Sequence, residues 1–510
     1  MRLGSYPNML NRLTALPLLI LFGLGVTLNR PAAAQGTALA ATAPGTDVDQ
    51  AAETAAGPDS AEETRDGRAP RRRSVVTSIA ASNFGMQCGI GKPTAGQKNC
   101  YGSGSIPIVW PATQAQPGLI RLHDSNTYWS ILNPSKGTYD WKNLDDWLDV
   151  IAQHQPVAAS QVFTMVPCWA TTTGTCGILA TGPTGSNGTP SDLTADGSPA
   201  FNSFVTAFVQ HCSPGNHCVK DLITYYEMWN EWDIQVHWVG TMQQLYQMLA
   251  PAAAIIRANV PKAVILSPSA TPASNTGAGY QCDFLNWLNY ESQHGRISDW
   301  VDFHVYLTDL QSEQTKTVTP EVQWSTVNQN FLKVRAGGVV SGCSSGSTAK
   351  GWASTPWANT ESNFNGSSQI FYSCPSDQYT PEDCTGQIVR WQILHDSNGA
   401  SGLFWYYWFN TIGSNPQYEP VYRQMMQYMV GGRFTAPAAS SGDIWTAPFV
   451  ESSGTPALWV WTPNESGASF TVPTGYVDYL DLSGITHSVT AGRLIAIGTE
   501  PFLLEQQGAL

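Results

Sequence analysis

Residues 75–432 alternate between short apolar runs and longer segments in which apolar residues recur at helical spacing. The short runs are rich in β-branched and aromatic residues and have the length of buried strands. We predict strands at residues 75–84, 118–123, 157–166, 222–229, 263–267, 300–306, 356–361 and 403–409. The amphipathic segments between them predict helices at residues 141–154, 201–209, 245–259, 284–294, 322–334, 387–395 and 421–430.

This alternation of strands and helices determines the expected fold class. It is typical of parallel βαβ units, and eight strands followed by helices predict an α/β fold, a (β/α)8 TIM barrel with insertions. Thr241 and Gln244 have the spacing of a capping box and predict the start of the helix at 245–259. An open doubly wound sheet is the alternative. That fold usually carries a glycine-rich phosphate loop after its first strand, and the sequence has no obvious one.

The pattern changes after Gly432. Short apolar runs at 457–461, 469–472, 477–482 and 494–497 are separated by Pro, Gly, Asn and Ser residues. Residues 75–432 are therefore expected to form the catalytic barrel, and residues 433–510 a small all-β, β-sandwich-like domain. This domain is more easily interpreted as an appendage packed on the barrel than as an independent carbohydrate-binding module.

The N-terminal region is different in composition from both of these parts. Arg2 and Arg12 supply positive charge before an apolar stretch at 14–28. Ala32-Ala33-Ala34, after that stretch, matches a small-residue cleavage site. Residues 1–34 therefore predict a signal peptide. An uncleaved membrane anchor is the alternative, but the stretch is shorter than the roughly 18–20 residues that span a bilayer. Residues 35–74 contain almost no large apolar residue and predict a disordered linker. We expect a secreted or periplasmic protein with no stable membrane insertion after cleavage.

All ten cysteines follow the signal peptide, and an even number in an exported chain indicates disulfides. The sequence does not prove the connectivity. Plausible pairs are Cys88–Cys100, Cys168–Cys176, Cys212–Cys218, Cys374–Cys384 and Cys282–Cys343. Metal binding by the His211-Cys212 and His217-Cys218 pairs is the less favoured alternative, since an oxidising compartment favours disulfides.

The charge of the chain excludes one class of partner. The formal net charge is −13, and loss of Arg2, Arg12 and Arg30 with the signal peptide makes it −13 − 3 = −16. Such an acidic protein is not expected to bind nucleic acid, which requires a basic surface. The 19 Trp, 19 Tyr and 17 Phe residues are more suited to stacking on sugar rings, although most will lie in the core.

Two glutamates stand at the ends of predicted strands. Glu231 closes the Trp229-Asn230-Glu231 triplet after the fourth strand, and Glu361 ends the seventh. Only 12% of the residues are charged, so two such positions are unusual. The C-terminal ends of barrel strands form one rim, and a pair of carboxyl groups on that rim is what hydrolysis of a glycosidic bond needs. Asn230 could hydrogen-bond the sugar hydroxyl beside the reacting carbon.

Several motifs occur in one order along the chain: Phe-Gly-Met at 84–86, Ile-Arg-Leu-His-Asp at 120–124, Trp129 with the segment 133–141, Tyr-Glu-Met-Trp-Asn-Glu at 226–231, His-Val-Tyr at 304–306, Thr-Glu at 360–361 and Trp-Tyr-Tyr-Trp at 405–408. With these motifs the chain resembles glycoside hydrolase clan A, most closely family 39 and its bacterial relatives. The resemblance covers residues 82–429. The chain departs from many clan members at Trp232-Asp233, where those members have proline after the Asn-Glu pair.

The resemblance implies a role for each matching residue and implies no metal or organic cofactor. Glu231 would be the general acid/base and Glu361 the nucleophile. Arg121 would hold Glu361 ionised, because a nearby cation lowers the pKa of a carboxyl group. The other implied substrate-site residues are Asn230, which would bind a sugar hydroxyl, Tyr306, which would hydrogen-bond the nucleophile, His304 in the same subsite, and Trp408 as the sugar platform, with Trp405 as the alternative.

These expectations combine into a secreted retaining glycosidase that cleaves β-linked oligo- or polysaccharides through a glycosyl-enzyme intermediate. A catalytically silent glycan-binding protein on the same barrel is the alternative. The combination of two glutamates with Asn230 and Arg121 disfavours it, since binding alone does not need all four. Transglycosylation with the same pair of carboxyl groups is a third possibility, which product analysis at high acceptor concentration would separate.

Overall fold

The computed structural model describes residues 78–87, 110, 116–177, 185–271, 280–307, 319–339, 343, 349–364, 380–406, 412 and 417–506. The chain divides into the units Met1–Arg71 and Arg72–Leu510, and all described residues belong to the second. The expected signal peptide and linker lie outside the described residues. Within the described ranges, no helix is both long enough and apolar enough to cross a membrane.

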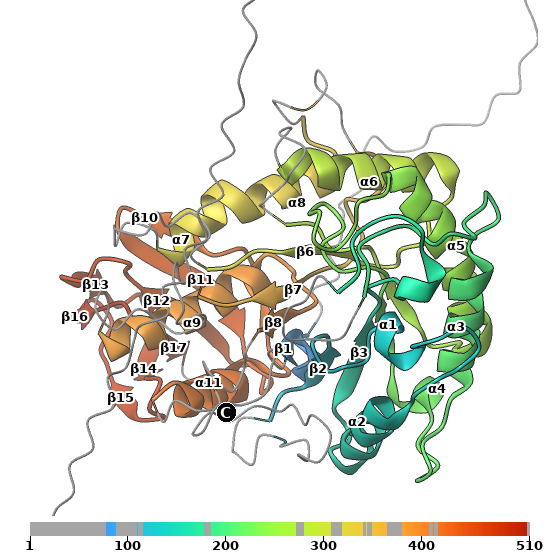
Figure 1. Cartoon of the computed structure of the whole chain (residues 1–510). Coiled ribbons are helices and arrows are strands. Elements are labelled where there is room, and N and C mark those ends of the chain that lie inside the picture. Colours follow the sequence, from blue (N-terminus) through green and yellow to red (C-terminus); the bar gives the residue numbers. More distant parts are fainter. Residues whose placement is uncertain are drawn as a thin grey trace, which may run out of the picture. The chain divides into compact units, whose positions relative to one another are not determined.

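Eight parallel strands form the predicted (β/α)8 barrel (Figure 1). Their order is β5-β4-β3-β2-β1-β8-β7-β6, and bridges Leu266–Trp300 and Ala270–Phe303 connect β5 with β6. The barrel is therefore nearly closed. The strands are β1 (Phe84–Gln87), β2 (Leu119–Leu122), β3 (Ala158–Val162), β4 (Tyr225–Glu227), β5 (Val264–Leu266), β6 (Val301–His304), β7 (Trp357–Ser362) and β8 (Leu403–Trp405).

Helices follow the strands at the predicted places. Thr241 caps α5 as expected, since its hydroxyl accepts from the Gln244 amide at 3.1 Å and the Gln244 side chain accepts from the Thr241 amide at 2.8 Å. The helix expected after β1 would fall largely outside the described residues. The helical elements are η1 (Ala81–Asn83), α1 (Trp129–Leu132), α2 (Lys142–Gln153), η2 (Cys168–Ala170), α3 (Pro199–Gln210), α4 (Val219–Leu222), α5 (Met242–Asn259), α6 (Tyr280–His294), α7 (Pro320–Gln323), η3 (Trp324–Asn328), α8 (Gln329–Arg335), α9 (Pro381–Ser397) and α11 (Tyr418–Met429).

Two predicted strands are placed differently in the structure. The first strand was expected at 75–84, but β1 begins at Phe84, after the short helix η1. Asn83 belongs to η1, and its side-chain amide donates to Asp396 at 3.2 Å and to the Ala400 carbonyl at 3.1 Å. The run expected at 222–229 begins in α4, and only Tyr225–Glu227 form β4. At the first of these two places, tertiary hydrogen bonds of Asn83 compete with an apolar run that has strand propensity.

The C-terminal region is the predicted all-β part. Seven strands form one antiparallel sheet, and β13 pairs with β16 in another. The indole of Trp461 donates to Glu321 of α7 at 2.7 Å, and Tyr428 of α11 donates to the Asp481 carbonyl at 2.9 Å. These bonds join the sheets to barrel helices. The strands are β9 (Arg433–Phe434), β10 (Ala439–Ser441), β11 (Ile444–Val450), β12 (Pro456–Trp461), β13 (Ala468–Thr471), β14 (Tyr476–Leu480), β15 (Thr486–Ser488), β16 (Leu494–Ile497) and β17 (Phe502–Gln506).

Three of the expected disulfides are confirmed: Cys168–Cys176, Cys212–Cys218 and Cys282–Cys343. The other two involve Cys88, Cys100 and Cys374, which lie outside the described residues. The alternative of a metal site is contradicted, because Cys212 and Cys218 are bonded to each other. Their neighbours His211 and His217 pair instead with Asp145 and Asp149 of α2, at 2.5 and 2.7 Å.

Candidate active site

Arg121 of β2 lies at the centre of the candidate site and is fully buried. Its guanidinium donates to both oxygens of Glu227 at 2.7 Å each, to Glu361 at 2.7 Å and to Asn230 at 2.8 Å, and also to Gln87. This planar cation thus fixes groups from β1, β4 and β7 together with the Asn230 amide. Burial alone would raise the pKa of Glu227, but the charge of Arg121 holds it at about 2.

Glu227 is a site residue that the sequence analysis missed. It ends β4 and is completely buried, and its carboxylate forms a two-pronged ion pair with Arg121. One signal could have identified it. In a chain with few charges, Arg121 and Glu227 are charged residues inside apolar strands, and a buried charge in a strand requires a partner of opposite sign.

The predicted nucleophile, Glu361, lies on β7 beside a β-bulge. Phe303 pairs with Asn359 and His304 pairs with Glu361, so Thr360 is the extra residue on β7. A bulge lets consecutive side chains reach the same side of a sheet. Accordingly, the Thr360 hydroxyl contacts His304 at 3.1 Å while Glu361 reaches Arg121. Tyr306 donates its phenolic proton to the other Glu361 oxygen, the contact that the sequence resemblance implied.

The predicted acid/base, Glu231, lies just beyond β4 on strained backbone. Its φ of 43° is in the left-handed region, which is uncommon for a residue with a side chain. The chain is held there by Ser269, whose hydroxyl accepts from the Glu231 amide at 2.9 Å and whose carbonyl accepts from the Trp232 amide at 3.3 Å. Proline at position 232 could not make the second bond. The residue at position 232 thus contributes a backbone hydrogen bond that proline would lack.

Two imidazoles hold the Glu231 carboxyl group. His304 Nδ1 lies 2.9 Å from Oε1, and His237 Nε2 lies 3.2 Å from Oε2. Burial would raise the pKa of Glu231, but these two hydrogen bonds and the imidazole charge hold it well below its usual range. The pKa of His304 moves the opposite way: burial opposes the charged form, yet Glu361, Glu227 and Glu231 raise it to about 10. Both pKa shifts have the same origin, the contact between the His304 imidazole and the Glu231 carboxylate.

The two predicted catalytic carboxyl groups are close together. An oxygen of Glu231, an oxygen of Glu361 and a ring nitrogen of His304 all lie within 4.8 Å of one another. Deeper in the barrel, Glu227, Asp302 and His304 form a second such group. There, burial and the Glu227 charge raise the pKa of Asp302 well above its usual range, and Thr360 donates to it at 2.7 Å. Arg121 already supplies the cation that this buried acidic group needs.

The rim next to β2 and β8 contributes polar groups that the sequence resemblance did not assign. Asp124, at a φ of 56°, accepts from Tyr406 at 2.8 Å and from Tyr128. Burial would raise its pKa, but His123 and the two phenols lower it. The Tyr406 ring lies 6.4 Å from that of Tyr306, edge to face. This rim thereby supports the tyrosine that binds Glu361.

The aromatic platform remains a prediction. Trp408, the first choice, lies outside the described residues. Trp405, the alternative, ends β8 and is completely buried, and its indole N–H has no hydrogen-bonding partner among the described residues.

The residues that replace the expected proline anchor the loop after β4. Trp232 is mostly buried, with its ring 5.8 Å from that of Trp287 on α6. Asp233 accepts from the Thr271 amide at 2.9 Å and from its hydroxyl at 3.1 Å. Burial, helped by the charge of Glu231, raises the pKa of Asp233 to about 7 despite these bonds.

The raised pKa of Asp233 predicts how the stability of the protein changes with pH. The stability contributed by neutral Asp233 is fully present below its unfolded pKa of about 4, and is lost as pH rises through about 7. Asp233→Asn removes the titration and keeps an oxygen for Thr271. We expect the variant to be more stable than wild type by about 2–4 kcal/mol at pH 7, with no gain at pH 4. Urea unfolding at the two pH values measures this, and equal differences at both would contradict it.

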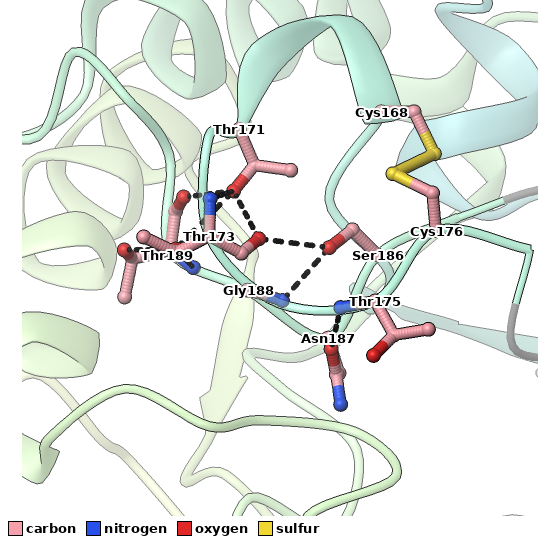
Figure 2. The surroundings of a disulfide bond; sticks show 9 residues. All are labelled: Cys168, Thr171, Thr173, Thr175, Cys176, Ser186, Asn187, Gly188 and Thr189. Atoms are coloured by element: carbon pink, nitrogen blue, oxygen red, sulfur yellow. Dashed lines mark hydrogen bonds between the residues drawn. A yellow bond between two sulfur atoms is a disulfide. The ribbon is translucent and has the colours of Figure 1, made fainter.

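The loop after β3 braces the loop after β4. The Cys168–Cys176 disulfide closes it, and the Thr175 amide donates to the Asn187 side chain at 2.8 Å (Figure 2). Asn187 then bonds the other loop on both sides, donating to the Gln235 carbonyl at 2.7 Å and accepting from the Val239 amide at 2.9 Å. The segment that carries His237 is thus fixed at two points.

Together these features define a class: a (β/α)8 barrel with paired carboxyl groups beyond β4 and on β7, linked by a buried arginine. No protein-family profile and no curated protein sequence matches the chain. Among solved structures, it is similar to a family 39 glycoside hydrolase from the gut symbiont Bacteroides cellulosilyticus WH2. The TM-score is 0.54 at 15% identity, covering 85% of this chain and 83% of that chain.

Two further solved structures have lower TM-scores. A family 39 β-xylosidase from Caulobacter crescentus has a TM-score of 0.48 at 13% identity, covering 86% of this chain and 98% of that one. A family 51 arabinofuranosidase from Xanthomonas axonopodis pv. citri also has 0.48, at 9% identity and the same coverage, 86% and 98%. The first likeness, at 0.54, shows a shared fold. At that level the resemblance predicted from the sequence is confirmed.

Proposed function

We propose that this protein is a secreted retaining glycosidase that cleaves β-glycosidic bonds in oligo- or polysaccharides. The observation that carries the proposal is the spacing of the two carboxyl groups: one oxygen of Glu231 and one oxygen of Glu361 lie within 4.8 Å of each other. Retaining enzymes place these groups about 5–5.5 Å apart, whereas inverting enzymes leave about 6.5–9.5 Å for a water molecule.

The geometry supports distinct roles for the two glutamates. Glu361 is oriented by Arg121 and Tyr306, one on each oxygen, and would attack the anomeric carbon as the bond to the leaving oxygen breaks. Glu231 would give its proton to that oxygen. In the second step an ionised Glu231 would take a proton from water, which attacks the glycosyl-enzyme and releases Glu361. Asn230, fixed by Arg121, is suited to bind the neighbouring sugar hydroxyl.

The low pKa of Glu231 bears on these two steps in different ways. It favours the second step, in which Glu231 acts as a base. For the first step Glu231 must hold a proton, and the His304 imidazole, 2.9 Å away, is placed to supply it when the leaving oxygen of the substrate reaches the carboxyl group. In the glycosyl-enzyme, Glu361 has lost its negative charge. Both imidazoles still contact Glu231 at that stage.

Secretion is part of the same proposal. The chain has an N-terminal sequence typical of a signal peptide, and the described residues contain three disulfides. Disulfides persist in oxidising compartments outside the cytosol. Detection of the mature protein, cleaved near residue 34, in the medium or periplasm would test this part separately.

The stereochemistry of the first product tests the mechanism. A panel of 4-nitrophenyl β-glycosides identifies the sugar that is cleaved fastest, and proton NMR then follows the anomer that forms before mutarotation. We expect the β-anomer first. An α-anomer would contradict the retaining mechanism. Absence of hydrolysis across both the panel and a set of natural polysaccharides would favour the silent glycan-binding alternative.

A further inference from the structure

His237 contacts the candidate acid/base but belongs to none of the motifs that carry the family resemblance. It lies on the loop after β4, and its Nε2 is 3.2 Å from Glu231 Oε2 and 3.2 Å from Asn230 Nδ2. An amide nitrogen has no lone pair to accept a hydrogen bond. If Nε2 carries a proton, that proton therefore belongs to the contact with Glu231.

We propose that His237 is a positioning residue for Glu231, whose Nε2–H holds the carboxyl oxygen that His304 leaves free. The inference rests on the proposed glycosidase function. The two imidazoles take different oxygens of one carboxyl group, at 2.9 and 3.2 Å, and so fix both its rotation and its charge. His304 is on a barrel strand with 1% of its side chain exposed, whereas His237 is on a loop with 13% exposed. His237 is thus the outer of the two donors.

Hydrogen bonds fix the main chain that carries His237. The His237 amide donates to the Ile234 carbonyl at 3.1 Å, and its own carbonyl accepts from the Trp229 indole at 3.2 Å. Asn187 brackets the same turn through Gln235 and Val239. With the main chain fixed in this way, only the side-chain torsions of His237 lose entropy when the ring hydrogen-bonds Glu231. Positioning by His237 therefore needs no rearrangement of the loop.

The charged and titratable groups around this pair come from several elements. Glu231 faces His304 of β6, Glu361 of β7, and His237 and Asp233 of its own loop, with Arg121 of β2 behind Asn230. The imidazole of His237 also lies near His123, at 6.5 Å between ring centroids. Of these groups, the two imidazoles are the ones that hydrogen-bond the Glu231 carboxylate.

The position of His237 has consequences of opposite sign for the two catalytic steps. An N–H donor stabilises the ionised carboxylate, so removing it raises the pKa of Glu231. The acid step then persists to higher pH, because Glu231 stays protonated longer. The base step begins only at higher pH, because the ionised form appears later.

The test compares wild type with His237→Ala and His237→Gln, whose amide N–H can replace Nε2–H. Substrates are the 2,4-dinitrophenyl and 4-methoxyphenyl glycosides of the sugar that is cleaved fastest. Departure of dinitrophenolate needs no proton, whereas departure of methoxyphenol does. For the methoxyphenyl substrate, we expect the basic limb of kcat/KM in His237→Ala to move up by about one pH unit. For the dinitrophenyl substrate, kcat/KM stays within about threefold, and His237→Gln restores the wild-type limb.

A matched control is His487→Gln, which removes an imidazole 2.7 Å from Asp481 in the C-terminal sheet. This control should leave the pH profile of kcat/KM unchanged for both substrates. Identical limbs in wild type and His237→Ala would overturn the inference, as would an equal loss of kcat/KM on both substrates at every pH. If wild type cleaves neither substrate, the proposed function itself fails, and this outcome is distinct from the other two.

Discussion

Glu361→Ala is expected to lower kcat by on the order of 10⁴ to 10⁶, because the glycosyl-enzyme can no longer form. The deleted carboxyl group leaves a space beside Arg121 and Tyr306, which both hydrogen-bond it in the wild type. Azide or formate can enter that space and attack the anomeric carbon from the side that Glu361 used. Glu231 still protonates the leaving oxygen. The product should therefore be an α-glycosyl azide, inverted relative to the β-linked substrate.

The measurement is the rate of aryl β-glycoside cleavage with and without 1 M azide, combined with NMR of the product. Glu465→Ala, in an exposed turn of the C-terminal region, is the matched control and should keep wild-type rates. Thermal melts establish whether Glu361→Ala is folded, and Glu361→Gln provides a variant of nearly the same shape. Unimpaired hydrolysis by folded Glu361→Ala would disprove the nucleophile assignment. So would azide rescue with retained configuration.

Arg121→Met is expected to cost about 3–5 kcal/mol of unfolding free energy, the usual effect of leaving a buried charge unpaired. Arg121 and Glu227 are both fully buried, and two hydrogen bonds of 2.7 Å join them. Without the guanidinium, the cation that remains beside Glu227 among the described residues is His304, 3.7 Å away. The loss should be larger at pH 7 than at pH 4. At pH 4 Glu227 can take up a proton and so lose its unpaired charge.

Two comparisons separate this effect from simple loss of volume. Lys142→Met breaks the exposed Lys142–Asp146 ion pair, also at 2.7 Å, and should leave the free energy of unfolding nearly unchanged, because water screens an exposed pair. Adding Glu227→Gln to Arg121→Met should recover part of the loss, because it removes the unpaired charge. Urea unfolding of the four proteins at pH 4 and pH 7 gives the free energies. A loss that is independent of pH and not reduced in the double variant would contradict the electrostatic explanation.

The sequence was most informative where local pattern and burial coincide. The capping box at Thr241 and Gln244 formed as predicted, and so did the helical stripe that follows it, because both depend on residues a few positions apart. The seven later strands were found within a few residues of their true ends. The first strand was misplaced, since Asn83 bonds to Asp396 more than 300 positions away, and no local pattern contains that contact.

The candidate site shows the same division. Glu231 and Glu361 could be selected as isolated charges at strand ends, and Arg121 and Tyr306 by their place in ordered motifs. Glu227 was missed, although it lies within the same motif as Glu231, because its partner is on another strand. His237 was missed because it approaches Glu231 through the turn of a loop that Asn187 holds from a neighbouring loop.

The sequence by itself determined that this chain builds a (β/α)8 barrel with a C-terminal all-β part and two conspicuous glutamates near the ends of its strands. Periodicity and composition suffice for this, because they record which side of each element is buried. Only the tertiary structure decided which buried polar groups meet: Arg121 with Glu227, Thr360 beside Glu361 through a bulge, and two imidazoles on Glu231. Those contacts depend on the register between strands and on the paths of loops, which bring together residues that are distant in sequence.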